Sequence, residues 1–150
     1  MLLQEYIPFQ IDKILLEKSI KENKTFEVKG VLQRAEAKNQ NGRIYPKEIL
    51  EREIENYKTG PIAENRALGH PESSVINLQN VSHNIKRLWW DGDDVMGEVE
   101  VLATPAGNIL KALFAAGVTV GISSRGMGSV KENMSEGTVE VQDDFELLCW

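Results

Sequence analysis

The chain has 150 residues, of which 41% are apolar and 27% are charged, a length and composition that match one compact globular domain. The formal net charge of −6 argues against a nucleic-acid-binding protein, because phosphate contacts require a basic face. No apolar stretch reaches the roughly 18–20 residues that a membrane span needs. We therefore expect neither nucleic acid nor membrane as a partner. The single cysteine, Cys149, excludes an internal disulfide bond and fits a reducing compartment.

The chain divides into a short N-terminal segment and one domain. Residues 1–24 are charged and only partly apolar, and we interpret them as an accessory or propeptide-like segment. Residues 25–150 form the expected domain. Its last residues, Leu147–Trp150, are apolar and would leave an aromatic side chain or a strand edge at the end of the chain. We therefore expect the domain to be truncated at its C-terminal end.

The first part of the domain predicts a strand, a loop and a helix. Residues 26–33 alternate well enough between apolar and polar side chains for a strand. A turn signal follows at residues 39–42. Pro46 occupies a position typical of a helix start, and the apolar residues of 47–57 lie along one helical face.

A hairpin and a second helix follow. Residues 81–89 and 95–101 are strand-like, and the sequence Asp-Gly-Asp-Asp at 91–94 is a strong hairpin turn signal. Its carboxylates also resemble part of a calcium loop, but the later EF-hand ligands are missing, which favours the turn. Residues 106–116 have helix-forming composition and end at Gly117.

The C-terminal part predicts a short strand at 118–122 and a last strand at 137–148. We found no internal repeat. Together with the earlier elements, this pattern predicts an α+β fold, which is a mainly antiparallel, barrel-like β domain with flanking helices.

Serine and histidine residues carry the candidate chemistry. A hydroxyl is a weak nucleophile at neutral pH, so a serine hydrolase needs an imidazole within hydrogen-bond reach and backbone donors for the oxyanion. Residues 121–126, Gly-Ile-Ser-Ser-Arg-Gly, combine two serines with glycines that let a substrate approach the backbone. His70, which precedes Pro71, could supply the base. The alternatives are that residues 123–126 form only a polar turn and that His70 only caps a loop.

Four motifs in order decide between these interpretations. They are Asn-Gly-Arg-Ile-Tyr-Pro-Lys at 41–47, Ala-Leu-Gly-His-Pro at 67–71, Leu-Trp-Trp-Asp-Gly-Asp-Asp-Val at 88–95 and Val-Gly-Ile-Ser-Ser-Arg-Gly-Met-Gly-Ser at 120–129. In this order, the chain resembles the prohead core (maturation) proteases of myovirus-type tailed bacteriophages, over most of its length.

The resemblance implies a serine peptidase related in fold to herpesvirus assemblin. Carried over to this sequence, His70 is the general base and Ser123 is the nucleophile. Ser124 is the rival nucleophile, although strand alternation would send the two serine side chains to opposite faces. Ser124, Arg125 and Gly126 are candidates for the oxyanion and substrate-binding site. Arg125 could equally be a structural residue that pairs with a carboxylate.

The third catalytic residue, which would orient His70, is not obvious from the sequence. The resemblance directs attention to the last strand, where Asp144 and Glu146 are candidates, although both could be ordinary exposed charges. His83 is a further candidate, and its alternative interpretation is a half-buried strand histidine.

The resemblance also implies the biological setting. The expected substrates are the phage scaffold and major capsid protein, cleaved inside the prohead in the host cytoplasm by a ring-like homo-oligomer. Neither a metal nor an organic cofactor is expected. The alternative is a catalytically inactive scaffold or capsid-associated structural protein with the same fold.

Cleavage after glutamate is also implied, with leucine or isoleucine two residues earlier. The triplets that end at Glu5, Glu17 and Glu22 fit this rule, and we expect that residues 1–22 can be removed, as in a zymogen. A preference for glutamate predicts a basic contact in the cleft, for which Arg125, Arg66 and Lys86 are candidates.

Overall fold

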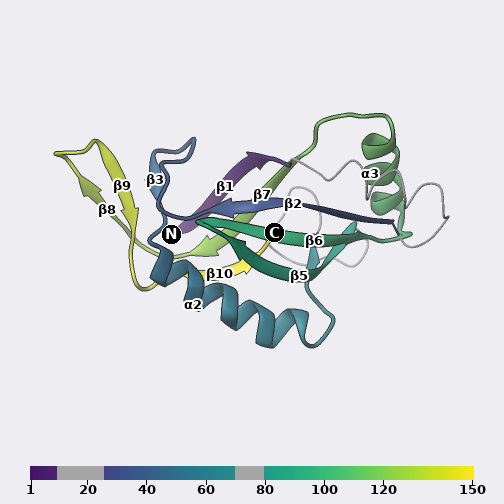
Figure 1. Ribbon diagram of the computed structural model, residues 1–150, viewed down its shortest axis with the longest axis horizontal. Coiled ribbons are helices and arrows are strands. Elements are labelled where there is room, and N and C mark those ends of the chain that lie inside the picture. The colour runs from purple at the N-terminus through teal and green to yellow at the C-terminus, as the bar shows by residue number, and fades with distance from the viewer. Residues whose placement is uncertain (10–25, 70–79) are drawn as a thin grey trace.

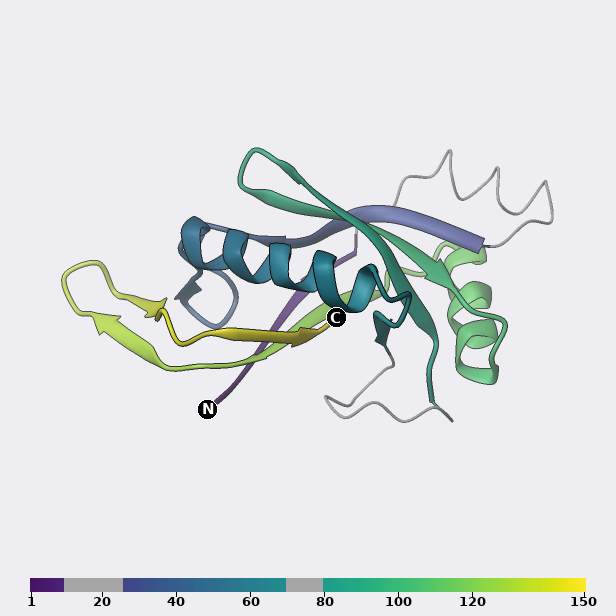
Figure 2. The same cartoon turned by 90° about the horizontal axis from the view of Figure 1, so that it is seen from below.

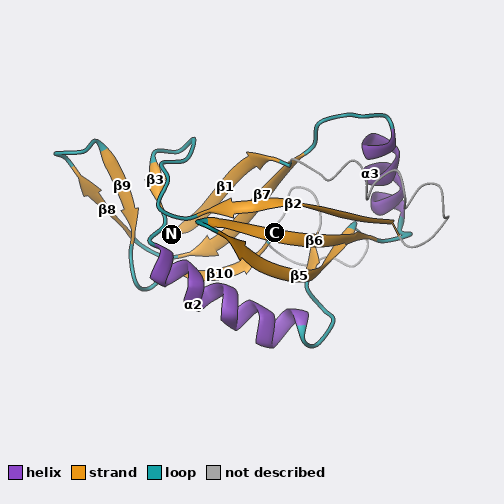
Figure 3. Ribbon diagram, in the orientation of Figure 1, coloured by secondary structure: helices purple, strands orange, loops and turns teal. Residues whose placement is uncertain are grey.

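The computed structural model describes residues 1–9, 26–69 and 80–150, and these residues form three β-sheets and two α-helices. Figures 1 and 3 show the β8–β9 hairpin at one end of the molecule and α3 at the other, with the remaining strands between them. The strands are β1 (Leu2–Pro8), β2 (Phe26–Arg34), β3 (Arg43–Ile44), β4 (Leu68–Gly69), β5 (His83–Asp91), β6 (Asp94–Val101), β7 (Gly121–Met127), β8 (Val130–Asn133), β9 (Thr138–Val141) and β10 (Glu146–Cys149), and the helices are α2 (Lys47–Tyr57) and α3 (Pro105–Ala115), with a π-helical turn η1 (Lys58–Ile62).

The largest sheet has the strand order β2-β6-β5-β4, and all of its strand pairs are antiparallel. The predicted hairpin is confirmed as β5–β6, which closes at Gly92 with a φ of 61° that favours glycine. Strand β6 alternates regularly because Val95, Val99 and Val101 point into the core. The smallest sheet, β3-β9-β8, contains the parallel pair β3–β9, so the fold is mainly rather than wholly antiparallel.

The third sheet has the order β1-β7-β10 and contains the predicted nucleophile. Strand β1 pairs with β7 in an unbroken antiparallel register from Leu2↔Met127 to Pro8↔Gly121. Residues 2–8 therefore belong to the same sheet as Ser123, while residues 10–24 of the predicted accessory segment lie outside the described residues. The alternative reading of residues 123–126 as a polar turn is wrong, because backbone pairing with β1 and β10 keeps them extended.

The helices begin and end close to where the sequence predicts. Helix α2 buries one side through Leu50, Ile54 and Tyr57, and Figure 2 shows it lying beside β10. The N-terminus of α3 is capped by Thr104, whose hydroxyl accepts a hydrogen bond from the backbone N–H of Gly107 at 3.0 Å. Among the described residues, no helix is long and apolar enough to cross a membrane.

The last strand predicted from the sequence, residues 137–148, is two strands. A turn closed by the hydrogen bond from the Phe145 N–H to the Gln142 carbonyl, 3.1 Å long, separates β9 from β10. Strand β9 pairs with β3 and β8, whereas β10 turns away to pair with β7. Strand β8 was not predicted from the sequence. The predicted fold class, mainly antiparallel β with flanking helices, is confirmed.

Candidate active site

Adjacent serines on β7 lie in opposite environments. The side chain of Ser124 is 3% exposed, and its register partner on β1 is the buried Glu5. Ser123 is opposite Tyr6 and is only partly buried. Because directly opposed residues in an antiparallel pair share a face, Ser124 and Glu5 point into the core while Ser123 and Tyr6 point to the other face.

His70 lies outside the described residues, but the residue before it does not. Gly69 is paired with His83 between β4 and β5, and the ring of His83 lies 3.1 Å through Nε2 from the carbonyl oxygen of Trp150. A Cβ atom on Gly69 would collide with both the His83 ring and that carbonyl oxygen. Glycine is therefore required here by the close approach of three chain segments, and His70 follows directly on this junction.

Both ring nitrogens of His83 have hydrogen-bond partners. The carbonyl of Trp150 can only accept a hydrogen bond, so Nε2 is the donor in that contact. Nδ1 lies 2.8 Å from the hydroxyl of Ser82. His83 is thus a hydrogen-bonded histidine at the point where β4, β5 and the end of β10 meet.

This junction is one strand away from the candidate nucleophile. Trp150 follows Cys149, and Cys149 is the register partner of Arg125 on β7. The residue before Trp150 thus lies beside the centre of β7, two positions from Ser123. Arg125 is itself only 8% exposed. Burial raises the pKa of the Cys149 thiol, and the positive charge of Arg125 opposes part of that shift.

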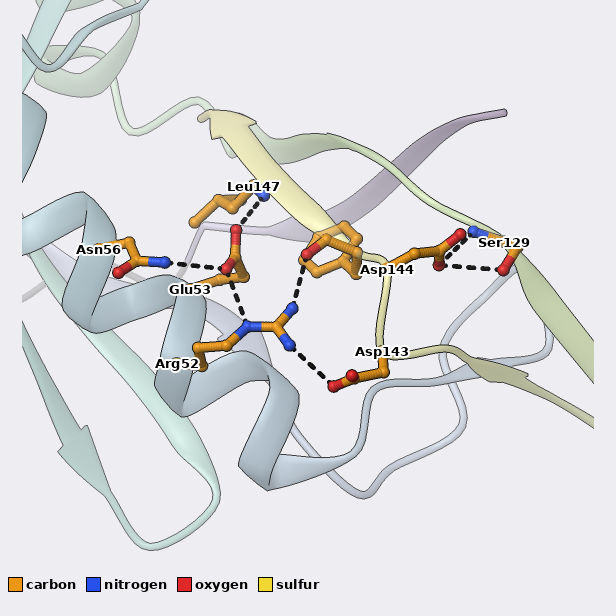
Figure 4. Close-up of polar contacts among 8 residues, drawn as sticks. Arg52, Glu53, Asn56, Ser129, Asp143, Asp144 and Leu147 are labelled. Carbon is orange, nitrogen blue, oxygen red and sulfur yellow. Dashed lines mark hydrogen bonds and ion pairs between the residues drawn. The ribbon is translucent and has the colours of Figure 1, made fainter.

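Asp144 and Glu146 lie at the other end of β7. The carboxylate of Asp144 accepts hydrogen bonds from the backbone N–H and the hydroxyl of Ser129, at 2.9 and 3.0 Å, which hold its pKa below the usual range (Figure 4). Glu146 is exposed and pairs with Met127. Met127 is four residues from Ser123, or about 13 Å along an extended strand. Of the three candidates, His83 alone contacts the residue that precedes His70.

Helix α2 anchors β10 through a polar cluster that the sequence did not reveal (Figure 4). The buried carboxylate of Glu53 accepts a hydrogen bond from the backbone N–H of Leu147 at 2.9 Å and others from Asn56 and Arg52, both at 3.2 Å. Arg52 also donates to the Phe145 carbonyl at 2.9 Å and to Asp143 at 2.8 Å. These contacts hold the outer edge of β10, and with it the segment that flanks Arg125.

The first sequence motif, residues 41–47, anchors strand β1. Glu5 is 5% exposed, and its carboxylate accepts hydrogen bonds from Arg43, Asn39 and Asn41. The amide of Asn41 also donates to the Gln4 carbonyl at 3.0 Å. We call these four side chains the Glu5 clasp. The sequence indicated Glu5 only as the end of a possible cleavage triplet, and its structural role was missed because a charge at an inward position interrupts the apolar alternation of β1.

The other charged candidates have surface partners. Arg66 pairs with Glu64, and Lys86 lies 3.6 Å from Glu100. In the hairpin turn, Asp93 forms an ion pair with Lys47 at 3.2 Å, and Asp94 forms one with Arg34, also at 3.2 Å. No group of three or more potential metal ligands occurs among residues 1–9, 26–69 and 80–150.

Comparisons with known proteins find relatives that share this fold and sequence. A search of solved structures matches the bacteriophage T4 capsid assembly protease with a TM-score of 0.84 and 27% sequence identity, over 99% of this chain and 93% of that chain. The prohead core protein protease of Enterobacteria phage T4 is 34% identical over 125 residues, which cover 80% of this chain and 58% of the relative. The chain thus spans little more than half the length of this curated relative.

The chain therefore has the fold of a phage capsid assembly protease. The family model described as "Prohead core protein serine protease" matches residues 11–149. The chain belongs to this family.

Proposed function

We propose that this chain is a serine endopeptidase of phage capsid maturation that cleaves scaffold and major capsid proteins inside the prohead, in the host cytoplasm. Membership of the prohead protease family supports this activity. The observation that carries the assignment is the position of Ser123, which is partly exposed on β7 while its neighbour Ser124 is buried in the core. Only a hydroxyl that substrate can reach can attack a peptide bond.

In the proposed mechanism, His70 removes the proton from the Ser123 hydroxyl as that oxygen attacks the scissile carbonyl. The protonated imidazole then returns the proton to the leaving amine. Backbone N–H groups near Ser123 to Gly126 stabilise the oxyanion of the tetrahedral intermediate. No step requires a metal or an organic cofactor.

For the third catalytic residue we favour His83 over Asp144 and Glu146. The His83 ring packs against Gly69, the residue before His70, whereas the carboxylate of Asp144 is engaged by Ser129. Because Ser82 and Trp150 occupy both ring nitrogens of His83, we propose that His83 acts by fixing Gly69, and so the start of the segment that carries His70. Cleavage after glutamate and assembly into a homo-oligomeric ring also form part of the proposal.

Four single variants test the assignment. Wild type, Ser123→Ala, Ser124→Ala and His70→Ala are assayed on a scaffold-derived peptide that contains glutamate at the cleavage position. We expect the Ser123 and His70 variants to lose at least about 10³-fold in kcat. Ser124→Ala should keep activity within about tenfold, because its side chain faces the core.

Further variants address the third residue and the alternative function. We expect His83→Ala to lower kcat more than Asp144→Ala or Glu146→Ala does. Activity that is lost in Ser124→Ala and retained in Ser123→Ala would reverse the nucleophile assignment. Scaffold processing that is unchanged in Ser123→Ala would favour the structural, non-catalytic alternative.

A further inference from the structure

The aromatic side chain of Tyr6 shares a face of the sheet with Ser123. Tyr6 is the register partner of Ser123, so both side chains leave the β1–β7 pair on the side away from the core. The neighbouring residues Glu5 and Ile7 point the other way. Tyr6 is 47% exposed, so much of its ring is open to solvent beside the candidate nucleophile.

The ring of Tyr6 lies over Gly121. A Cβ atom on Gly121 would overlap the Cε2, Cζ and Oη atoms of Tyr6. Gly121 precedes Ser123 by two residues and shares its face, which places it about 6.6 Å along the strand. The glycine before the two serines of the motif thus leaves room for an aromatic ring next to the nucleophile.

This spacing matches the geometry of an extended peptide. Alternate side chains of an extended chain lie on the same face, again about 6.6 Å apart. A substrate peptide that lies over the outer face of β7, with its scissile carbonyl at Ser123, brings a side chain two residues away against the Tyr6 ring. Pro8, the partner of Gly121, extends the apolar surface there. A half-exposed tyrosine ring and a proline favour an apolar side chain, because both can bury carbon surface against it.

We propose that Tyr6, seated over Gly121, forms a subsite that binds an apolar side chain of the substrate peptide two residues from the scissile bond. The inference rests on the proposed endopeptidase function. It makes strand β1 part of the substrate-binding site. Removal of residues 1–22, which the sequence led us to expect, would therefore weaken substrate binding, so this proposal places substrate cleavage before that removal.

Steady-state kinetics of Tyr6→Ala test the subsite. With a peptide that carries leucine two residues from the scissile bond, we expect KM to rise about tenfold with kcat nearly unchanged. Replacing that leucine by serine should weaken binding to the wild type and have little effect on Tyr6→Ala. Tyr6→Leu, which keeps an apolar side chain, should retain most of the preference.

A matched control lies on the same strand. Leu2 is apolar, 45% exposed and on the same face of β1 as Tyr6, but it pairs with Met127 at the far end of β7. Leu2→Ala should leave both KM and the leucine preference unchanged. Equal effects of Leu2→Ala and Tyr6→Ala would mean that β1 acts only through general stability, and would overturn the proposal.

A double-mutant cycle tests the contact itself. Gly121 does not have a left-handed φ, so alanine is compatible with its backbone, but the new Cβ would displace the Tyr6 ring. Gly121→Ala should therefore raise KM in the wild-type background. It should have no further effect in Tyr6→Ala, because the ring that it displaces is gone.

A binding measurement separates this proposal from the proposed function. Fluorescence anisotropy of a labelled peptide, with Ser123→Ala as the parent, reports affinity without turnover. If the wild type cleaves peptides but Tyr6→Ala has unchanged KM, affinity and preference, the subsite is wrong while the endopeptidase function stands. If the wild type cleaves no peptide and the parent binds none, the proposed function fails, and the subsite fails with it. Should Tyr6→Ala not fold, Tyr6→Thr replaces it, since threonine favours strands and also lacks the ring.

Discussion

Burial at single residues determines which groups of this protein can react. Cys149 is 6% exposed, and burial raises the pKa of its thiol, so the thiol stays protonated and weakly nucleophilic. Tyr45 and Tyr57 are buried as well, and burial raises the pKa of both phenols above the usual range. Ser123 differs from these groups because it is accessible from the outer face of β7.

These buried acids predict a loss of stability in alkaline solution. The unfolded state ionises its thiol near pH 8.5 and its phenols near about pH 10, whereas the folded state keeps these protons to higher pH. Their contribution to stability is therefore complete below about pH 8.5 and is lost as the pH rises toward the folded-state values. The free energy of unfolding should fall by up to about 1.4 kcal/mol per pH unit for each such group.

Urea denaturation between pH 7.5 and 10, under reducing conditions, measures this effect. Cys149→Ala should have a smaller slope than the wild type between about pH 8.5 and 9.5, because the thiol of the unfolded chain ionises before its phenols do. The comparison uses slopes because the substitution also lowers stability at neutral pH. Identical slopes would show that the thiol has the same pKa in both states.

At the scale of elements, local signals identified the helices and the hairpin. The start of α2 at Pro46, its apolar face and the turn at Gly92 are set by residues that are close together in the sequence. These features can therefore be predicted from the sequence alone. Strand β1 was read only as an accessory segment because its inward Glu5 is stabilised by Arg43, which is 38 residues away. The division between β9 and β10 likewise depends on partners in other elements.

The candidate site was predictable only in part. The ordered motifs indicated Ser123, and strand alternation predicted that Ser123 and Ser124 face opposite ways. Which of the two serines faces the core depends on the pairing of β7 with β1, a long-range contact that no local pattern specifies. The position of Tyr6 beside Ser123 was missed for the same reason.

The contact between α2 and β10 gives a prediction at this scale. Glu53 is 6% exposed and accepts the backbone N–H of Leu147, so Glu53→Ala removes a charge-assisted hydrogen bond and leaves a buried donor without its partner. We expect a loss of about 2–3 kcal/mol in the free energy of unfolding, and faster amide hydrogen exchange in β10.

Glu55 on the same helix is the control. Its side chain is 66% exposed and lies 3.9 Å from Lys58, so Glu55→Ala should cost less than about 0.5 kcal/mol. Chemical denaturation gives the stabilities, and mass spectrometry gives the exchange. A Glu53 variant as stable as the Glu55 variant would mean that β10 does not depend on α2.

At the scale of the whole molecule, the Glu5 clasp joins two sheets and the loop that follows β2. Glu5 belongs to the sheet that carries Ser123, Arg43 to the sheet of β3, and Asn39 and Asn41 to the loop that follows β2. The edge strands β1 and β2 belong to different sheets. A polar cluster therefore fixes the position of β1, and with it Tyr6, relative to the rest of the domain.

Breaking the clasp should loosen β1 selectively. Arg43→Ala leaves the buried Glu5 carboxylate without its cation, and we expect a loss of about 3 kcal/mol in the free energy of unfolding. Arg34→Ala breaks an exposed ion pair with Asp94 and should cost less than about 1 kcal/mol. In hydrogen-exchange mass spectrometry, Arg43→Ala should increase exchange in residues 1–9 more than in β5, which contributes no residue to the clasp. Uniform acceleration across both segments would mean that the clasp contributes only to global stability, whereas a selective increase in β1 would show that this motif holds the N-terminal strand against the strand of Ser123.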